Sequence, residues 1–130
     1  MKELVLVIED DETLRSNLFE FLEMEEFNVL SAQDGCSGLQ LAQEIKPNLI
    51  ICDINMPNLN GFEVLKKLRE DVTTAKIPFI FHTSETDSDS HRRAMQLGAN
   101  AYLTKPVTLE KFLETVTNQC QLARSVKVKG

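Results

Sequence analysis

The chain has 130 residues, 42% of them hydrophobic, which suffices for one compact domain with a core and is too little for two. With 20 acidic and 14 basic residues, it carries a formal net charge of -6. This charge argues against direct binding to nucleic acid and favours cations or other proteins as partners.

The N-terminal segment and the cysteines indicate the cellular compartment. Only five apolar residues follow Met1–Glu3 before acidic residues appear, so neither a signal peptide nor a membrane span is predicted there. Cys36, Cys52 and Cys120 are far apart and lack the spacing of zinc sites or redox pairs, so we expect free thiols in a reducing compartment. We therefore expect a cytoplasmic protein that makes no membrane contact.

Taken in chain order, four short apolar runs have the length of strands that are buried on both faces: Leu4–Ile8, Leu49–Cys52, Phe79–Phe81 and, more weakly, Ala101–Leu103. A further short strand fits Phe27–Ser31. A segment with helical character follows each of these five strands, the fourth of them around His91–Leu97. In the other four helices the residues expected to face inward are Leu14, Leu18, Phe21 and Leu22; Leu39, Ala42 and Ile45; Leu65 and Leu68; and Leu109, Leu113, Val116 and Cys120.

Residues that break regular structure separate these elements, at Lys46–Asn48, Asn58–Gly61, Ile77–Pro78 and Gly98. The alternation of strand and helix predicts an α/β fold, because right-handed crossovers build such units into a parallel sheet. We expect a doubly wound five-stranded sheet in the flavodoxin-like order 2-1-3-4-5, with five helices on its two faces. One domain would cover residues 1–125, followed by a short basic tail at 126–130.

The residues that directly follow each run are the most informative, because ligands in open α/β sheets bind beyond the carboxyl ends of the strands. One edge of the predicted sheet carries acids, hydroxyl groups and a lysine: Glu9, Asp10 and Asp11; Asp53; Thr83 and Ser84; and Thr104, Lys105 and Pro106.

The acidic residues at this edge predict a cation site. Adjacent first and third strands would bring Asp10 and Asp53 close together, with Glu9 beside them. Three carboxylates at such distances repel one another unless a cation lies among them, and oxygen ligands suit Mg2+ or Mn2+. Asp11 and Glu12, in contrast, are expected to cap the first helix and to complement its dipole.

Taken together, these segments resemble the receiver domain of two-component response regulators, especially the single-domain chemotaxis type. The match extends from about Lys2 to Arg124, and its ordered set of segments is specific although each segment is common alone. The matching segments are Val7–Glu12, Asp53–Pro57, Asn60–Gly61, Thr83–Ser84, Leu97–Tyr102 and Thr104–Pro106.

The resemblance implies phosphorelay signal transduction, with Asp53 accepting a phosphoryl group from a sensor histidine kinase or a histidine phosphotransfer protein. Glu9, Asp10, Asp53 and the backbone carbonyl of Asn55 would hold Mg2+ or Mn2+, and Lys105 would pair with a phosphoryl oxygen. Such a protein is not a classical enzyme, although it catalyses its own phosphorylation and dephosphorylation.

The resemblance also implies a conformational switch. Thr83 would move onto the phosphoryl group, Tyr102 would swing inward behind it, and the Lys105–Pro106 peptide bond would be cis. The face made by the fourth helix, fifth strand and fifth helix would then control a downstream protein, and the resemblance leaves homodimer formation open.

Four further positions bear on how such a switch would be tuned. Asn55 and Glu85 resemble the pair that influences the access of water to the phosphoryl group in chemotaxis-type regulators, so we expect a short-lived phosphoryl state. Ser84 stands where alanine is more usual and should still leave Asp53 accessible. His82 stands at a position that is more often aliphatic; we interpret it as a packed strand histidine, with pH-sensitive tuning as the alternative.

Other classes of protein fit the sequence less well. A haloacid-dehalogenase-type hydrolase would need a DxDx(T/V) motif after the first strand, where Glu9–Glu12 stand instead. A flavodoxin-like electron carrier would need a glycine-rich phosphate loop there, and a P-loop motif is absent from the sequence. A pseudo-receiver that only binds partners is disfavoured because Asp10, Asp53, Thr83 and Lys105 are all present. The remaining alternative is a receiver domain from the N-terminus of a longer transcription factor or hybrid protein.

Overall fold

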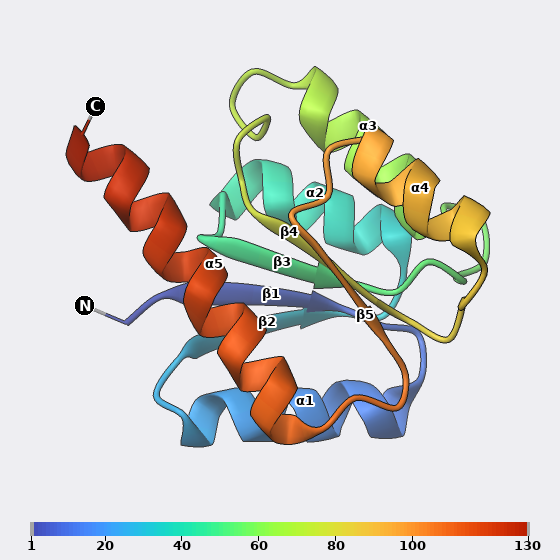
Figure 1. The fold of residues 1–130 in the computed structure, drawn as a ribbon, viewed down its shortest axis with the longest axis horizontal. Coiled ribbons are helices and arrows are strands. Elements are labelled where there is room, and N and C mark those ends of the chain that lie inside the picture. Colours follow the sequence, from blue (N-terminus) through green and yellow to red (C-terminus); the bar gives the residue numbers. More distant parts are fainter. Residues whose placement is uncertain (1, 130) are drawn as a thin grey trace.

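A five-stranded parallel sheet forms the centre of the computed structural model, which describes residues 2–129 (Figure 1). The sheet has the order β2-β1-β3-β4-β5, as predicted. Its strands are β1 (Leu4–Ile8), β2 (Asn28–Ala32), β3 (Leu49–Cys52), β4 (Phe79–Thr83) and β5 (Ala101–Thr104).

Five helices cover the two faces of the sheet. Figure 1 shows α1 and α5 on one face and α2, α3 and α4 on the other. The helices are α1 (Glu12–Met24), α2 (Gly35–Ile45), α3 (Gly61–Glu70), α4 (Ser88–Gln96) and α5 (Leu109–Lys129). The doubly wound α/β fold is therefore confirmed.

Two apolar cores lie between these layers. Because side chains alternate along a strand, Ile50 and Phe81 pack towards α2, α3 and α4, whereas Ile51 and Ile80 pack towards α1 and α5. Both faces of the central strands are thus buried, which explains why β1 and β3 are apolar at every position and why β4 is apolar up to Phe81.

The polar residues at the helix starts behave as their chemistry predicts. The Asp11 carboxylate accepts a hydrogen bond from the backbone N of Leu14 at 2.9 Å and so caps α1, and Glu12 is the acid in the first turn. Asn60 and Glu63 form a reciprocal capping box at the start of α3. These caps fix where the helices begin, immediately after the loops at the carboxyl edge of the sheet.

The expected inward faces of α2 and α5 need correction. Ile45 is half exposed, and Leu109 is 56% exposed. Within residues 109–124 of α5, the buried residues are Phe112, Val116 and Cys120, which recur every four residues, whereas Leu113 is only partly buried. Leu109 lies in the first turn of α5, which borders an open groove rather than the core.

Some strand boundaries differ by one or two residues from those expected, and those of α4 and α5 differ by more. Thr83 pairs with Thr104 in the ladder between β4 and β5, so both strands extend further than their apolar runs. The helix α5 continues through residues 126–129, where a tail was expected, while Gly130 lies outside the described residues. Within residues 2–129, every helix is too short or too polar to cross a membrane.

Candidate functional site

Asp53 occupies the centre of the carboxyl edge of the sheet, directly after β3. Its side chain is buried, and Oδ1 accepts a hydrogen bond from the backbone N of Ile54 at 2.7 Å. Gly61 lies against the same residue, because a Cβ atom at position 61 would collide with the carbonyl oxygen of Asp53. The start of α3 therefore approaches Asp53 more closely than a side chain would allow.

Three carboxylates gather at this edge. Glu9, Asp10 and Asp53 each offer an oxygen, and these oxygens lie within 4.8 Å of one another. Glu9 and Asp53 are buried, whereas Asp10 is exposed to solvent. Burial raises the pKa of Glu9, even though hydrogen bonds from Lys105 and from the backbone of Asp11 favour its charged form. The cluster is therefore a strongly negative site that would gain from a further cation.

Lys105 is the positive charge that the fold supplies to this cluster. Its Nζ atom lies 2.9 Å from Oε1 of Glu9 and 3.1 Å from Oδ2 of Asp53. Burial by itself would lower the pKa of the ammonium group, but the hydrogen bond to Glu9 and the charge of Asp53 outweigh burial, so the pKa is raised. The peptide bond between Lys105 and Pro106 is cis.

A chain of hydrogen bonds leads from the cluster to β5. The hydroxyl of Thr83, fully buried at the end of β4, accepts a hydrogen bond from the backbone N of Glu85 at 3.2 Å. The side-chain carboxylate of Glu85 accepts a hydrogen bond from Nδ2 of Asn55 at 2.7 Å. The backbone carbonyl oxygen of Glu85 accepts a hydrogen bond from the hydroxyl of Tyr102 at 2.8 Å. His91 of α4 contacts the Tyr102 ring edge-on, with 4.8 Å between ring centroids. Glu85 thus touches both the Asp53 loop and the aromatic residue of β5.

The predicted site residues fall into two sets. The structure brings Glu9, Asp10, Asp53 and Lys105 together as one charged cluster, and it links Thr83, Asn55, Glu85 and Tyr102 beside it. Ser84 is exposed at the rim. His82 is packed against Phe112 on the α1 and α5 side of the sheet, as expected for a strand histidine.

Sequence reasoning missed a contact between α1 and this site. Arg15 donates a hydrogen bond from its guanidinium group to the carbonyl oxygen of Glu9 at 2.9 Å. It lies one helical turn after Asp11, so the spacing on α1 could have indicated that it returns towards the end of β1. This contact ties α1 to the loop that carries Glu9 and Asp10.

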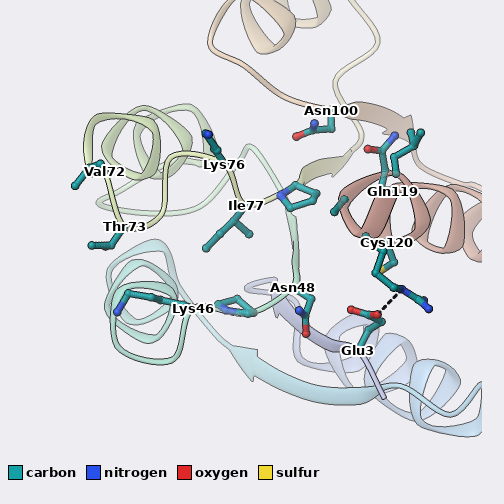
Figure 2. A pocket seen from close by; sticks show the side chains of 15 residues that line it. Glu3, Lys46, Asn48, Val72, Thr73, Lys76, Ile77, Asn100, Gln119 and Cys120 are labelled. Carbon is teal, nitrogen blue, oxygen red and sulfur yellow. Dashed lines mark ion pairs between the residues drawn. The ribbon is translucent and has the colours of Figure 1, made fainter. Parts of the chain in front are cut away.

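A separate hollow lies at the opposite edge of the sheet (Figure 2). It measures about 550 Å3, is lined in part by Asn48, Ile77 and Cys120, and includes none of the predicted site residues. An ion pair between Arg124 and Glu3, 2.9 Å long, lies at its border. The acidic cluster is therefore set apart from this hollow by the length of the strands.

Comparisons with known proteins agree with this geometry. The sequence profile of the Response regulator receiver domain family matches residues 5–117. The chain is 37% identical over 112 residues to Protein PilH of Pseudomonas aeruginosa, which covers 86% of this chain and 93% of PilH. It is 36% identical over 112 residues to the DNA-binding dual master transcriptional regulator RpaA of Synechocystis, covering 86% of this chain but only 46% of RpaA. The structure of the chemotaxis protein CheY4 of Vibrio cholerae is similar with a TM-score of 0.86 and 30% identity, covering 91% of this chain and 98% of CheY4.

Proposed function

The chain belongs to the response regulator receiver domain family of two-component systems, and we propose that it accepts a phosphoryl group on Asp53 and transmits this event as a change of shape. The observation that carries the proposal is the position of Lys105, which bridges Glu9 and Asp53 within a cluster of three carboxylates. A buried aspartate beside a lysine and two further acids is suited to phosphoryl transfer, in which positioning and charge stabilisation supply most of the catalysis.

The acidic cluster fits a divalent cation. The carboxylates of Glu9, Asp10 and Asp53 exceed the charge of Lys105, and the hard oxygen ligands match those that Mg2+ or Mn2+ prefers. We assign these three side chains and the backbone carbonyl of Asn55 as the protein ligands. When bound, the ion would neutralise charge that develops on the transferred phosphoryl oxygens.

The side chains of Asp53 and Lys105 take part directly in the proposed phosphoryl transfer. A carboxylate oxygen of Asp53 attacks phosphorus, a new O–P bond forms, and the P–N bond of a phosphohistidine breaks so that its imidazole nitrogen keeps the electron pair. Lys105 would move its hydrogen bond from the Asp53 carboxylate to a phosphoryl oxygen, since its ammonium already lies 3.1 Å from Oδ2. The donor would be a sensor histidine kinase or a histidine phosphotransfer protein.

The switch would begin at Thr83. Its hydroxyl can donate to a phosphoryl oxygen, a movement that would disturb the hydrogen bond it accepts from the backbone of Glu85. Because the Tyr102 hydroxyl donates a hydrogen bond to the backbone carbonyl of Glu85, displacement of the loop that contains Glu85 would change this contact and so affect Tyr102 in β5. The face formed by α4, β5 and α5 would then bind or release a downstream protein.

Asn55 and Glu85 would set the lifetime of the phosphoryl group. Their side chains meet across the loops that follow β3 and β4, in a hydrogen bond of 2.7 Å. An amide and a carboxylate at this place can orient a water molecule towards phosphorus, which supports a short-lived phosphoryl state.

Residues 1–125 would form the receiver domain, and the cytoplasm is the compartment in which its kinase partners would meet it. The coverage of only 46% of RpaA supports a second candidate, in which this chain is the receiver portion of a longer regulator. Both candidates assign the same chemistry to Asp53.

The proposed function is tested by incubating the wild-type chain and Asp53→Asn with acetyl phosphate and Mg2+. Phosphorylation should add one phosphoryl mass to the wild type and none to the variant, and chelation of Mg2+ should abolish the addition. Asp89→Asn, at an exposed position in α4, is a matched control that should be phosphorylated like the wild type. Equal phosphorylation of wild type and Asp53→Asn, or none of the wild type, would contradict the assignment.

A further inference from the structure

The side chain of Arg15 ties α1 to the main chain at the carboxyl end of β1. Its Nη1 atom donates a hydrogen bond of 2.9 Å to the backbone carbonyl oxygen of Glu9. Among the described residues Arg15 forms no ion pair, although three carboxylates lie at the same edge of the sheet. The guanidinium group therefore acts on the backbone rather than on an acidic side chain.

The carbonyl group that Arg15 holds belongs to the peptide unit between Glu9 and Asp10, two of the three carboxylates of the cluster. A peptide unit is planar, so a hydrogen bond to its oxygen also fixes the direction in which the Cα atom of Asp10 lies. The flanking backbone N atoms are held as well, that of Glu9 by the carbonyl of Ala32 at 3.1 Å and that of Asp11 by Oε2 of Glu9 at 3.1 Å. Arg15 supplies the contact at the peptide unit itself.

Asp10 depends on this contact more than the other two carboxylates do. Lys105 holds the side chains of both Glu9 and Asp53, and the backbone N of Ile54 holds Asp53 in addition. The Asp10 carboxylate is exposed and accepts no hydrogen bond from the described residues. The place of Asp10 in the cluster is therefore set by its backbone.

We propose that Arg15 is a positioning residue for the divalent cation, acting through Asp10 by holding the peptide unit that precedes it. The inference rests on the proposed cation site. Two effects of the guanidinium group oppose each other there. Its positive charge repels a cation, but pairs of charges exposed to water change an affinity by only about fivefold or less. Groups that orient metal ligands account for about 10- to 100-fold in metal affinity, so the positioning effect should dominate.

The test is the Kd for Mn2+, obtained from the electron paramagnetic resonance signal of free Mn2+ during a titration of the full chain. Arg15→Met keeps a long side chain with good helix propensity but removes the charge and the donors, and its Kd should be about tenfold higher than that of the wild type. A loss of positive charge alone would lower the Kd instead. Arg124→Met, which removes an exposed arginine at the opposite edge of the sheet, should keep the wild-type Kd.

A double-variant cycle separates positioning from a general loss of structure. In an Asp10→Ala background, Arg15→Met should change the Kd by less than about twofold, because the ligand through which Arg15 acts is absent. A tenfold change that persists in this background would overturn the proposal. Circular dichroism without metal checks that Arg15→Met is folded, and Arg15→Leu, which also lacks charge and donors, replaces it in both titrations if it is not.

The wild-type titration distinguishes this inference from the function on which it rests. A wild-type chain that does not bind Mn2+ would overturn the cation site, and the role of Arg15 with it. Saturable binding to the wild type, with an equal or lower Kd in Arg15→Met, would overturn the role of Arg15 alone.

Discussion

The Nζ atom of Lys105 lies 2.9 Å from Oε1 of Glu9, although 96 residues separate the two in sequence. The contact closes the charged cluster from the β5 side, and the same Nζ atom reaches Asp53. Because Glu9 and Asp53 are buried, a missing ammonium group would leave negative charge without a partner.

Replacing Lys105 by alanine should slow phosphorylation of Asp53 by about 100-fold, which is typical of losing one group that stabilises developing charge. The initial rate of mass gain with acetyl phosphate and Mg2+ measures this effect. Lys66→Ala, at an exposed lysine of α3, should keep the wild-type rate. A rate for Lys105→Ala within twofold of the wild type would contradict the proposed role.

The side-chain contact between Asn55 and Glu85 leads to a prediction about dephosphorylation. Glu85→Ala removes the carboxylate that accepts from Asn55 and should slow loss of the phosphoryl group by about fivefold, as expected when one orienting hydrogen bond is lost. The decay of phosphorylated protein after removal of acetyl phosphate measures this rate. Asp89→Ala, which removes an exposed acid of α4, is the control, and equal decay in Glu85→Ala and the wild type would disprove a tuning role.

Gly61 should tolerate no side chain. In Gly61→Ala, the new Cβ atom would collide with the carbonyl oxygen of Asp53, so either α3 or the Asp53 loop must shift. We expect the free energy of unfolding to fall by about 1–3 kcal/mol, the range for overpacked sites, and phosphorylation to slow as well. Urea unfolding monitored by circular dichroism tests the stability effect against Lys66→Ala, and a Gly61→Ala protein as stable and as active as this control would refute the close approach.

The buried His82 should make stability depend on pH. Its pKa is about 4 in the folded chain against an ordinary value of 6.5. Between pH 4 and pH 6.5, His82 is therefore protonated in the unfolded chain and neutral in the folded chain. The stabilisation from this difference is present in full above pH 6.5 and is lost as the pH falls through 4, with a total of up to about 3 kcal/mol.

His82→Leu should therefore lose less stability than the wild type when the pH is lowered from 6.5 to 4. Urea unfolding at a series of pH values gives the two slopes. His91→Gln, which replaces an exposed histidine of α4, should retain the wild-type slope. Parallel curves for His82→Leu and the wild type would show that His82 does not titrate in this way.

The fold could be predicted from sequence because the central strands are buried on both faces and each contains an unbroken apolar run. The strand-end rule then placed Glu9, Asp53 and Lys105 on one edge, where the structure brings their side chains together. The orientation of α5 was less accessible, since Leu109 and Leu113 have the same spacing as the true core residues and only the angle of the helix on the sheet decides between them.

The contacts of Glu85 could not be predicted from spacing. The hydrogen bond from Tyr102 ends on a backbone carbonyl, which every residue type possesses, so the sequence contains no signal for it. The approach of Gly61 to Asp53 is similar, because a glycine in a loop indicates conformational freedom without naming the atom that it approaches.

Glu85 uses different atoms for its two contacts, its carboxylate for Asn55 and its main-chain carbonyl for Tyr102. A substitution at position 85 changes the first contact and retains the acceptor of the second. The lifetime of the phosphoryl group and the transmission of the signal would therefore be separable properties. Variants at position 85 would differ in this lifetime and still act through the same α4, β5 and α5 face.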